Sequence, residues 1–129
     1  MTLIARIIVG LLLLAHGLVH LLYLFPSADD PKYPFTLTRS WLLPGPTRRP
    51  VALVLITAVV LGFLASALAL WGVPGLSGHW SATTIAAASM SIALLIAFWD
   101  RQLWIGVLID ALLVAAALVP LSWVDALLP

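Results

Sequence analysis

The stretch LIARIIVGLLLLAHGLVHLLYLF, at residues 3–25, decides the fold of this chain. A helix of roughly 20 mostly apolar residues crosses a hydrocarbon core about 30 Å thick, and this stretch meets that requirement. The apolar run is too long for a signal peptide, and no small-residue cleavage site follows it. We therefore expect residues 3–25 to be a membrane span that stays in the protein.

The composition of the whole chain indicates the same class of protein. Of its 129 residues, 64% are hydrophobic and only 9% are charged, whereas about a quarter of the residues in a soluble domain are charged. The mean hydropathy is +1.18. These values exclude a soluble globular enzyme, a disordered segment and a nucleic-acid-binding protein, so the expected partner is the lipid bilayer. Because the chain has no cysteine, disulfides, thiolate metal sites and cysteine nucleophiles are excluded as well.

Three further apolar segments are long enough to cross a bilayer. They cover about residues 51–71, 81–99 and 103–119. Together with the first span, they predict an all-α, integral membrane four-helix bundle that forms a single domain over residues 1–129. We expect Pro26 to end the first helix, Pro50 to lie in the first turn of the second and Pro120 to limit the fourth.

One long polar loop, residues 26–50, joins the first two spans. Its segment 34–43 is amphipathic enough to lie along the membrane interface. The simpler interpretation is a proline-rich loop that anchors Trp41 among the lipid headgroups. The alternative is a lid over a pocket in the bundle.

The basic residues predict an orientation in the membrane. Four spans place the first and third connections on one side, and these carry five of the six basic residues: Lys32, Arg39, Arg48, Arg49 and Arg101. Cytoplasmic loops are enriched in Lys and Arg. We therefore expect loop 26–50 to be cytoplasmic and both termini to lie outside.

Polar residues occur at a similar depth in all four spans. At 1.5 Å per residue, His16 and Asp110 both lie roughly 13 Å below the surface that carries the long loop. Thr57 and Ser91 fall in the same layer by the same reckoning. His20 is one turn nearer the loop on the face of His16, and Tyr23 continues that face.

Three interpretations of this layer stay open. The first is a polar clasp, in which an imidazole partners the carboxylate of Asp110 and fixes the packing of the helices. The second is a ligand pocket in which Asp110 orients His16, with Trp41 and Tyr23 at the entrance. The third is a metal or haem site built from His16, His20 and Asp110, since two histidines and one carboxylate suit non-haem iron.

Small residues recur every four positions on the second span, at Ala58, Gly62 and Ser66. Such stripes let helix backbones approach closely. The stripe fits a compact bundle, and it equally fits a homo-oligomer if it faces lipid.

The first span also resembles the first-span signature of the DoxX family. That signature has an arginine, a glycine four residues later, an apolar run and then His-Gly, which Arg6, Gly10, His16 and Gly17 match. His20 stands where the family often has lysine. The second span departs from the pattern, because Arg48-Arg49-Pro50 stands where a carboxylate is often found.

The resemblance implies a small accessory subunit of a quinone-linked or other membrane redox system in a bacterial cell membrane. Its ligand would be quinone-like or otherwise lipophilic, bound near His16, His20 and Asp110. Two alternatives from other classes remain. One is a structural membrane protein whose polar layer only fixes helix packing, and the other is a metal-dependent membrane enzyme.

Overall fold

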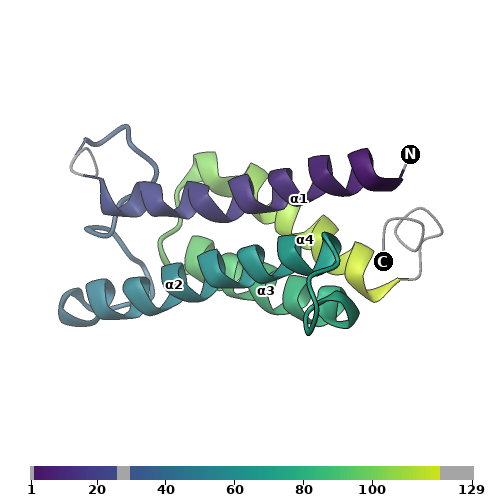
Figure 1. Ribbon diagram of the computed structural model, residues 1–129. Helices are drawn as coiled ribbons and strands as arrows, with labels where there is room; N and C mark the ends of the chain where they lie inside the picture. The colour runs from purple at the N-terminus through teal and green to yellow at the C-terminus, as the bar shows by residue number, and fades with distance from the viewer. Residues whose placement is uncertain (1, 26–29, 120–129) are drawn as a thin grey trace.

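The computed structural model describes residues 2–25 and 30–119, and the described part is helical and contains no strand (Figure 1). The fold class predicted from the sequence, all-α with four long helices, is confirmed. In chain order the elements are α1 (Thr2–Leu18), the 3-10 helix η1 (Val19–Leu24), α2 (Gly45–Leu70), η3 (Ser77–His79), α3 (Trp80–Ala97), η4 (Arg101–Leu103) and α4 (Trp104–Leu118).

Four helical stretches are long and apolar enough to cross a membrane. They are Leu3–Leu24, Gly45–Leu70, Ser77–Ala97 and Arg101–Leu118. Their outward faces carry large apolar side chains that water would not favour; Leu12, Val54 and Leu112, for example, are each more than half exposed. An apolar exterior of this kind suits a lipid environment, which is consistent with an integral membrane protein.

The helices run up and down in sequence, each packing on the next (Figure 1). α1 packs on α2, α2 on α3 and α3 on α4, whereas the backbones of α1 and α4 stay apart. The start of α1 and the end of α4 lie at one end of the bundle. The first loop (residues 30–44) and the turn into η4 lie at the opposite end. The bundle therefore has one loosely closed seam, between α1 and α4.

Two sequence-based boundaries were wrong. α2 begins at Gly45, so the described loop ends at residue 44 and Pro50 lies inside the helix. Pro46 occupies the first turn, where the missing N–H has no partner to lose. Pro50 sits only one turn deeper and removes a single backbone hydrogen bond, which the helix tolerates near its end. The expectations for Pro26 and Pro120 lie outside the described residues.

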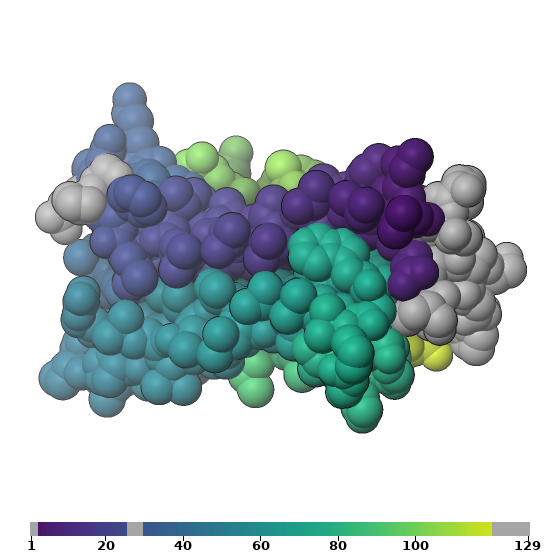
Figure 2. Space-filling model, viewed as in Figure 1, coloured from purple at the N-terminus to yellow at the C-terminus, as the bar shows by residue number. Residues whose placement is uncertain are grey.

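The small-residue stripe of α2 packs inside the bundle. A Cβ added at Gly62 would lie 2.8 Å from the Cβ of Ala87 on α3. Gly17 plays the same part between α1 and α2, because a Cβ there would lie 2.7 Å from the Cβ of Phe63. The stripe therefore serves the compact bundle. Figure 2 shows the surfaces of α1 and α2 meeting along the viewed face.

The start of α1 is fastened to the end of α2. Arg6 Nε donates to the carbonyl of Leu70 at 2.9 Å, and Trp71 Nε1 donates to the carbonyl of Arg6 at 3.0 Å. A side chain at Gly10 would overlap the Trp71 indole. Arg6 therefore satisfies a carbonyl at the C-terminus of α2, where a cation also complements the helix dipole.

We predict that Gly62→Ala destabilises the bundle. The added methyl group meets the Cβ and the backbone of Ala87, neither of which can turn away, and overpacking of this kind costs about 1–3 kcal/mol. Thermal unfolding in detergent, followed by circular dichroism, measures the change. Gly78→Ala is the matched control, because nothing lies within 4 Å of its added Cβ. Equal stability of the two variants would contradict the intramolecular packing of the stripe.

Candidate functional site

A buried polar network joins the first, third and fourth spans. It consists of His16 on α1, His20 on η1, Ser91 on α3 and Asp110 on α4. His16 Nε2 lies 2.8 Å from Asp110 Oδ1. Ser91 Oγ lies 2.5 Å from Asp110 Oδ2 and 2.8 Å from His20 Nε2. Ser91 and Asp110 are fully buried, and His20 is 1% exposed.

The common depth of these residues follows from helix geometry. In spans that run up and down, residues at equal distances from the same end fall in one layer. The structure brings His16, Ser91 and Asp110 together, as the sequence predicted. His20 joins them because it lies one turn beyond His16, and Ser91 Oγ reaches it from the facing helix. The contact between His16 and Asp110 is the polar clasp.

Thr57 does not belong to this network, contrary to the sequence prediction. Its side chain is exposed, and its hydroxyl donates to the carbonyl of Leu53 on its own helix at 2.7 Å. The rotation of α2 turns Ile56 and Val59 inward instead. The α2 residue that contacts His16 is Phe63, six positions beyond Thr57, whose ring lies edge-to-face with His16 at a centroid distance of 5.0 Å.

Asp110 determines the hydrogen bonding of His16. A carboxylate accepts hydrogen bonds, so Nε2 of His16 carries the hydrogen that it shares with Oδ1. The rings of Phe63 and His20 flank His16 edge-to-face and hold its orientation. Within the described ranges, no hydrogen-bond partner reaches Nδ1 of His16. That nitrogen is therefore the one left for a ligand.

His20 differs because both of its nitrogens are engaged. Nδ1 lies 3.1 Å from the carbonyl oxygen of His16 and 3.2 Å from that of Gly17. Nε2 faces Ser91. His20 therefore offers only the carbon edge of its ring to anything outside the network.

An apolar pocket of about 370 Å³ lies along the seam between α1 and α4. His16 and His20 form part of its wall, next to the hydrocarbon side chains of both helices. Its lining comprises Ala15, His16, Val19, His20, Phe35, Leu95, Gln102, Leu103, Ile105, Gly106 and Ile109. Val19, Ile105 and Ile109 are 37%, 52% and 39% exposed, so the lining continues onto the lipid-facing surface.

The residues predicted for the entrance lie elsewhere. Tyr23 is 2% exposed and packs edge-to-face on Phe35, with ring centroids 5.2 Å apart. Trp41 donates from Nε1 to the carbonyl of Ile96 at 2.6 Å and lines a different hollow, next to Trp99. The first loop reaches the pocket through Phe35 instead. Sequence reasoning missed Phe35, since a lone aromatic residue in a proline-rich loop carries no positional signal.

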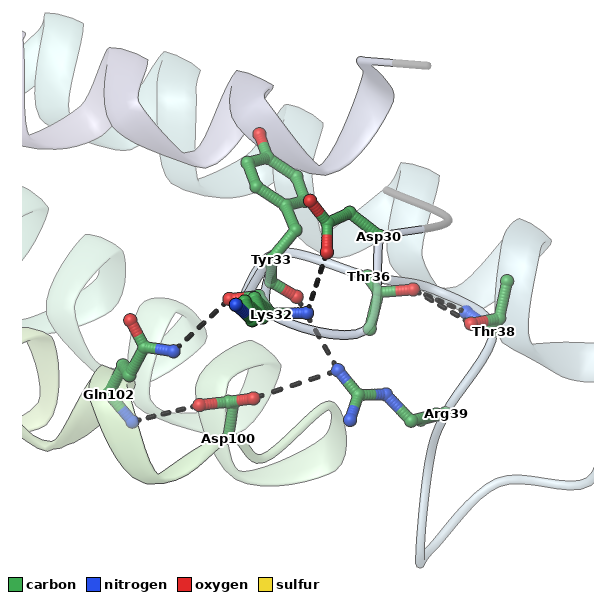
Figure 3. A network of polar contacts seen from close by, with 8 residues as sticks. All are labelled: Asp30, Lys32, Tyr33, Thr36, Thr38, Arg39, Asp100 and Gln102. Carbon is green, nitrogen blue, oxygen red and sulfur yellow. Dashed lines mark hydrogen bonds and ion pairs between the residues drawn. The ribbon is translucent and has the colours of Figure 1, made fainter. Parts of the chain in front are cut away.

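The first loop is held on the ends of η1 and η4 by polar contacts rather than by a helix of its own (Figure 3). Tyr33 donates its hydroxyl hydrogen to the carbonyl of Leu22 at 2.8 Å. Arg39 lies 3.7 Å from the carboxylate of Asp100, and Gln102 donates to the carbonyl of Lys32 at 3.2 Å. These contacts hold the part of the loop from which Phe35 lines the pocket.

The donor atoms do not converge as a metal site would require. Among the described residues, no three His, Cys, Asp or Glu side chains form a group that could hold a metal ion. Nε2 of His16 is directed at Asp110, while Nε2 of His20 is directed at Ser91. The two imidazoles therefore turn these nitrogens to different partners and not to a common point.

The chain was compared with models of protein families, with curated proteins and with solved structures, and no match was found in any of the three.

We predict that Asp110→Ala lowers the free energy of unfolding of the bundle strongly. The substitution leaves His16 and Ser91 without their shared acceptor, and breaking a buried pair in this way costs about 3–5 kcal/mol. Asp100→Asn is the control, because asparagine can still accept from the Gln102 N–H and the change removes only the partly exposed pair with Arg39, and such pairs contribute about 0–1 kcal/mol. Thermal or denaturant unfolding in detergent compares them. A small loss for Asp110→Ala would show that the network does not hold the helices together.

Proposed function

We propose that this protein binds a lipophilic ligand with an oxygen-bearing ring, such as a quinone or quinol, in the pocket between α1 and α4. The observation that carries the proposal is the apolar pocket whose wall includes His16, with Asp110 behind that imidazole. Ligand pockets combine apolar walls with a few well-placed polar groups in this manner.

The pocket suits a ring with a long apolar tail. Its volume of about 370 Å³ lies at the lower end of the range for small-molecule sites, which is roughly 300–1,000 Å³. That room accommodates a single substituted ring. Because the lining continues onto the exposed side chains of Val19 and Ile105, a tail would leave the seam towards lipid and would not need to be enclosed.

His16 can form a hydrogen bond with either the quinol or the quinone form of such a ligand. With Nε2–H donated to Asp110, the neutral ring offers a lone pair at Nδ1, which accepts a hydrogen bond from a quinol hydroxyl. A protonated ring would instead donate from Nδ1 to a quinone carbonyl. Asp110 supports both arrangements because it holds the opposite nitrogen in place.

We further propose that the chain is a DoxX-like accessory subunit of a bacterial membrane redox system. The support is local, since four residues of α1 match the family's first-span signature: Arg6, Gly10, His16 and Gly17. Each of them lies at a close contact between α1 and another part of the bundle. The predicted orientation is kept, with the first loop in the cytoplasm. Its support is that the loop and the turn before η4, which carries Arg101, share one end of the bundle.

The competing function is purely structural. The described network links α1, η1, α3 and α4 by hydrogen bonds, which is what a helix clasp needs without any ligand. The two functions differ in what they require of the pocket. If the network only holds the helices together, a larger side chain that fills the pocket leaves its role unchanged. If the pocket binds a ligand, the same substitution weakens binding.

We predict that Ile105→Trp weakens binding of a short-tailed benzoquinol by about tenfold or more, equivalent to at least 1.4 kcal/mol. The indole would occupy the pocket wall, where Ile105 now lies. Leu108→Trp is the matched control, since Leu108 is exposed on the same helix and does not line the pocket. Equilibrium dialysis with protein in lipid nanodiscs measures both. Equal binding by the two variants would place the ligand elsewhere.

We predict a second effect for His16→Gln. Glutamine keeps a donor for Asp110 but removes the ring nitrogen at Nδ1, so the quinol loses a hydrogen bond worth about 0.5–1.5 kcal/mol. The same dialysis assay should show weaker binding, while thermal unfolding shows the helices still packed. If His16→Gln binds as tightly as the wild type, His16 has no role as the ligand's partner and the structural function is favoured.

A further inference from the structure

The hydroxyl of Ser91 contacts two titratable side chains at once. Its oxygen lies 2.5 Å from Asp110 Oδ2 and 2.8 Å from His20 Nε2. A serine hydroxyl has one hydrogen, so it can donate to only one of these atoms. The other contact needs a hydrogen from the opposite side.

The rest of His20 restricts where that hydrogen can be. Its Nδ1 faces the carbonyl oxygens of His16 and Gly17, and a carbonyl can only accept. Nδ1 therefore carries a hydrogen. A neutral His20 then has a bare lone pair at Nε2, directed at Ser91. If Asp110 were also an ionised carboxylate, both partners of Ser91 would be acceptors and one short contact would contain no hydrogen.

We propose that Asp110, Ser91 and His20 hold one additional proton and share it along this line. In one arrangement His20 is an imidazolium that donates from Nε2 to Ser91, and Ser91 donates to the Asp110 carboxylate. In the other, Asp110 is a carboxylic acid that donates from Oδ2 to Ser91, and Ser91 donates to neutral His20. Every contact contains a hydrogen in both arrangements.

The two arrangements interconvert without any other reactant. The Nε2–H bond of His20 breaks as its proton moves to Ser91 Oγ, and the hydroxyl proton of Ser91 moves to Asp110 Oδ2. The reverse transfer restores the first arrangement. Ser91 is unchanged at the end, so it acts as a bridge.

Burial gives an independent reason for the proton. Asp110 is fully buried, and an ionised carboxylate without a counter-charge is unfavourable in an apolar membrane bundle. Of the described side chains in the network, those that titrate are His16 from α1, His20 from η1 and Asp110 from α4, while α2 contributes the apolar Phe63 and α3 the hydroxyl of Ser91. One proton makes the His20–Asp110 pair neutral overall in either arrangement.

The shared proton would also control proton transfer between His16 and the ligand, and this step rests on the proposed function. When the proton is on His20, Asp110 is an anion that stabilises positive charge on His16. Nδ1 of His16 can then take the proton of a quinol hydroxyl, leaving a quinol anion as the O–H bond breaks and an N–H bond forms. When the proton is on Asp110, that support is withdrawn. The ligand class is therefore one that exchanges protons with the protein.

The test uses ligand-free protein in phosphatidylcholine bilayers at neutral pH. Infrared spectroscopy detects the carboxylic acid form of Asp110, and ¹⁵N nuclear magnetic resonance of the histidine rings detects imidazolium at His20. In the wild type, the fraction of acid at Asp110 and the fraction of imidazolium at His20 should sum to one, and a change of temperature should move them in opposite directions. An ionised Asp110 together with a neutral His20 would overturn the proposal.

Three variants complete the test. Ser91→Ala should end the opposed changes, whereas Thr57→Ala, which removes an exposed hydroxyl on α2, should behave like the wild type. Asp110→Asn imitates the acid form, because its amide can accept from His16 and donate to Ser91, so it should keep the fold and leave His20 neutral. Imidazolium at His20 in Asp110→Asn would contradict the shared proton. Since no ligand is present, these results are independent of whether the pocket binds a quinol.

Discussion

The structure depends on how a fully buried carboxylate is satisfied inside an apolar bundle. Asp110 on α4 takes hydrogen bonds from two other spans, through His16 on α1 and Ser91 on α3. The backbones of α1 and α4 stay apart, so it is the long imidazole of His16 that crosses the seam. Towards the chain termini the seam is closed by apolar packing, because Leu13 of α1 and Leu113 of α4 belong to one hydrophobic cluster. The pocket lies on the other side of the His16–Asp110 contact, nearer the first loop.

The contacts of α1 explain how that geometry is kept. At one end of α1, Arg6 donates to the carbonyl of Leu70 and its own carbonyl accepts from the indole of Trp71, for which Gly10 leaves room. About two turns beyond Gly10 along the helix, Gly17 lets α1 pack closely on Phe63. α1 is therefore fixed against α2 on both sides of the level at which His16 reaches across to α4. Arg6, Gly10 and Gly17 therefore set the position of α1 on α2.

Helix rise along the sequence indicated which polar residues share a level, but it carried no information about the direction in which each side chain points. Helix rise alone placed His16, Ser91 and Asp110 at one level, and they do meet. The same reasoning included Thr57, but it counted depth from Pro50, whereas α2 begins at Gly45 and its residue beside His16 is Phe63. Helix rise also carries no information about rotation, which buries Val59 and leaves Thr57 exposed. The loop was harder still. Trp41 was expected at the entrance as the obvious interfacial residue, but backbone contacts with η1 and η4 bring Phe35 there instead. Non-local contacts of that kind have no periodic pattern in the sequence.

A structural role and a binding role for the network differ at one atom. His20 uses both ring nitrogens within the bundle, and Asp110 and Ser91 are fully buried, so these three residues are committed to the protein interior. His16 is different, because its side chain is 13% exposed and only Nε2 has a partner among the described residues. A clasp needs nothing more than Nε2. A histidine that also lines a pocket and keeps Nδ1 unpaired is more than a clasp requires, since an asparagine or glutamine could donate to Asp110 without presenting a basic nitrogen. That surplus basic nitrogen, on a ring held by the buried carboxylate of Asp110, is the feature that a purely structural network leaves unexplained.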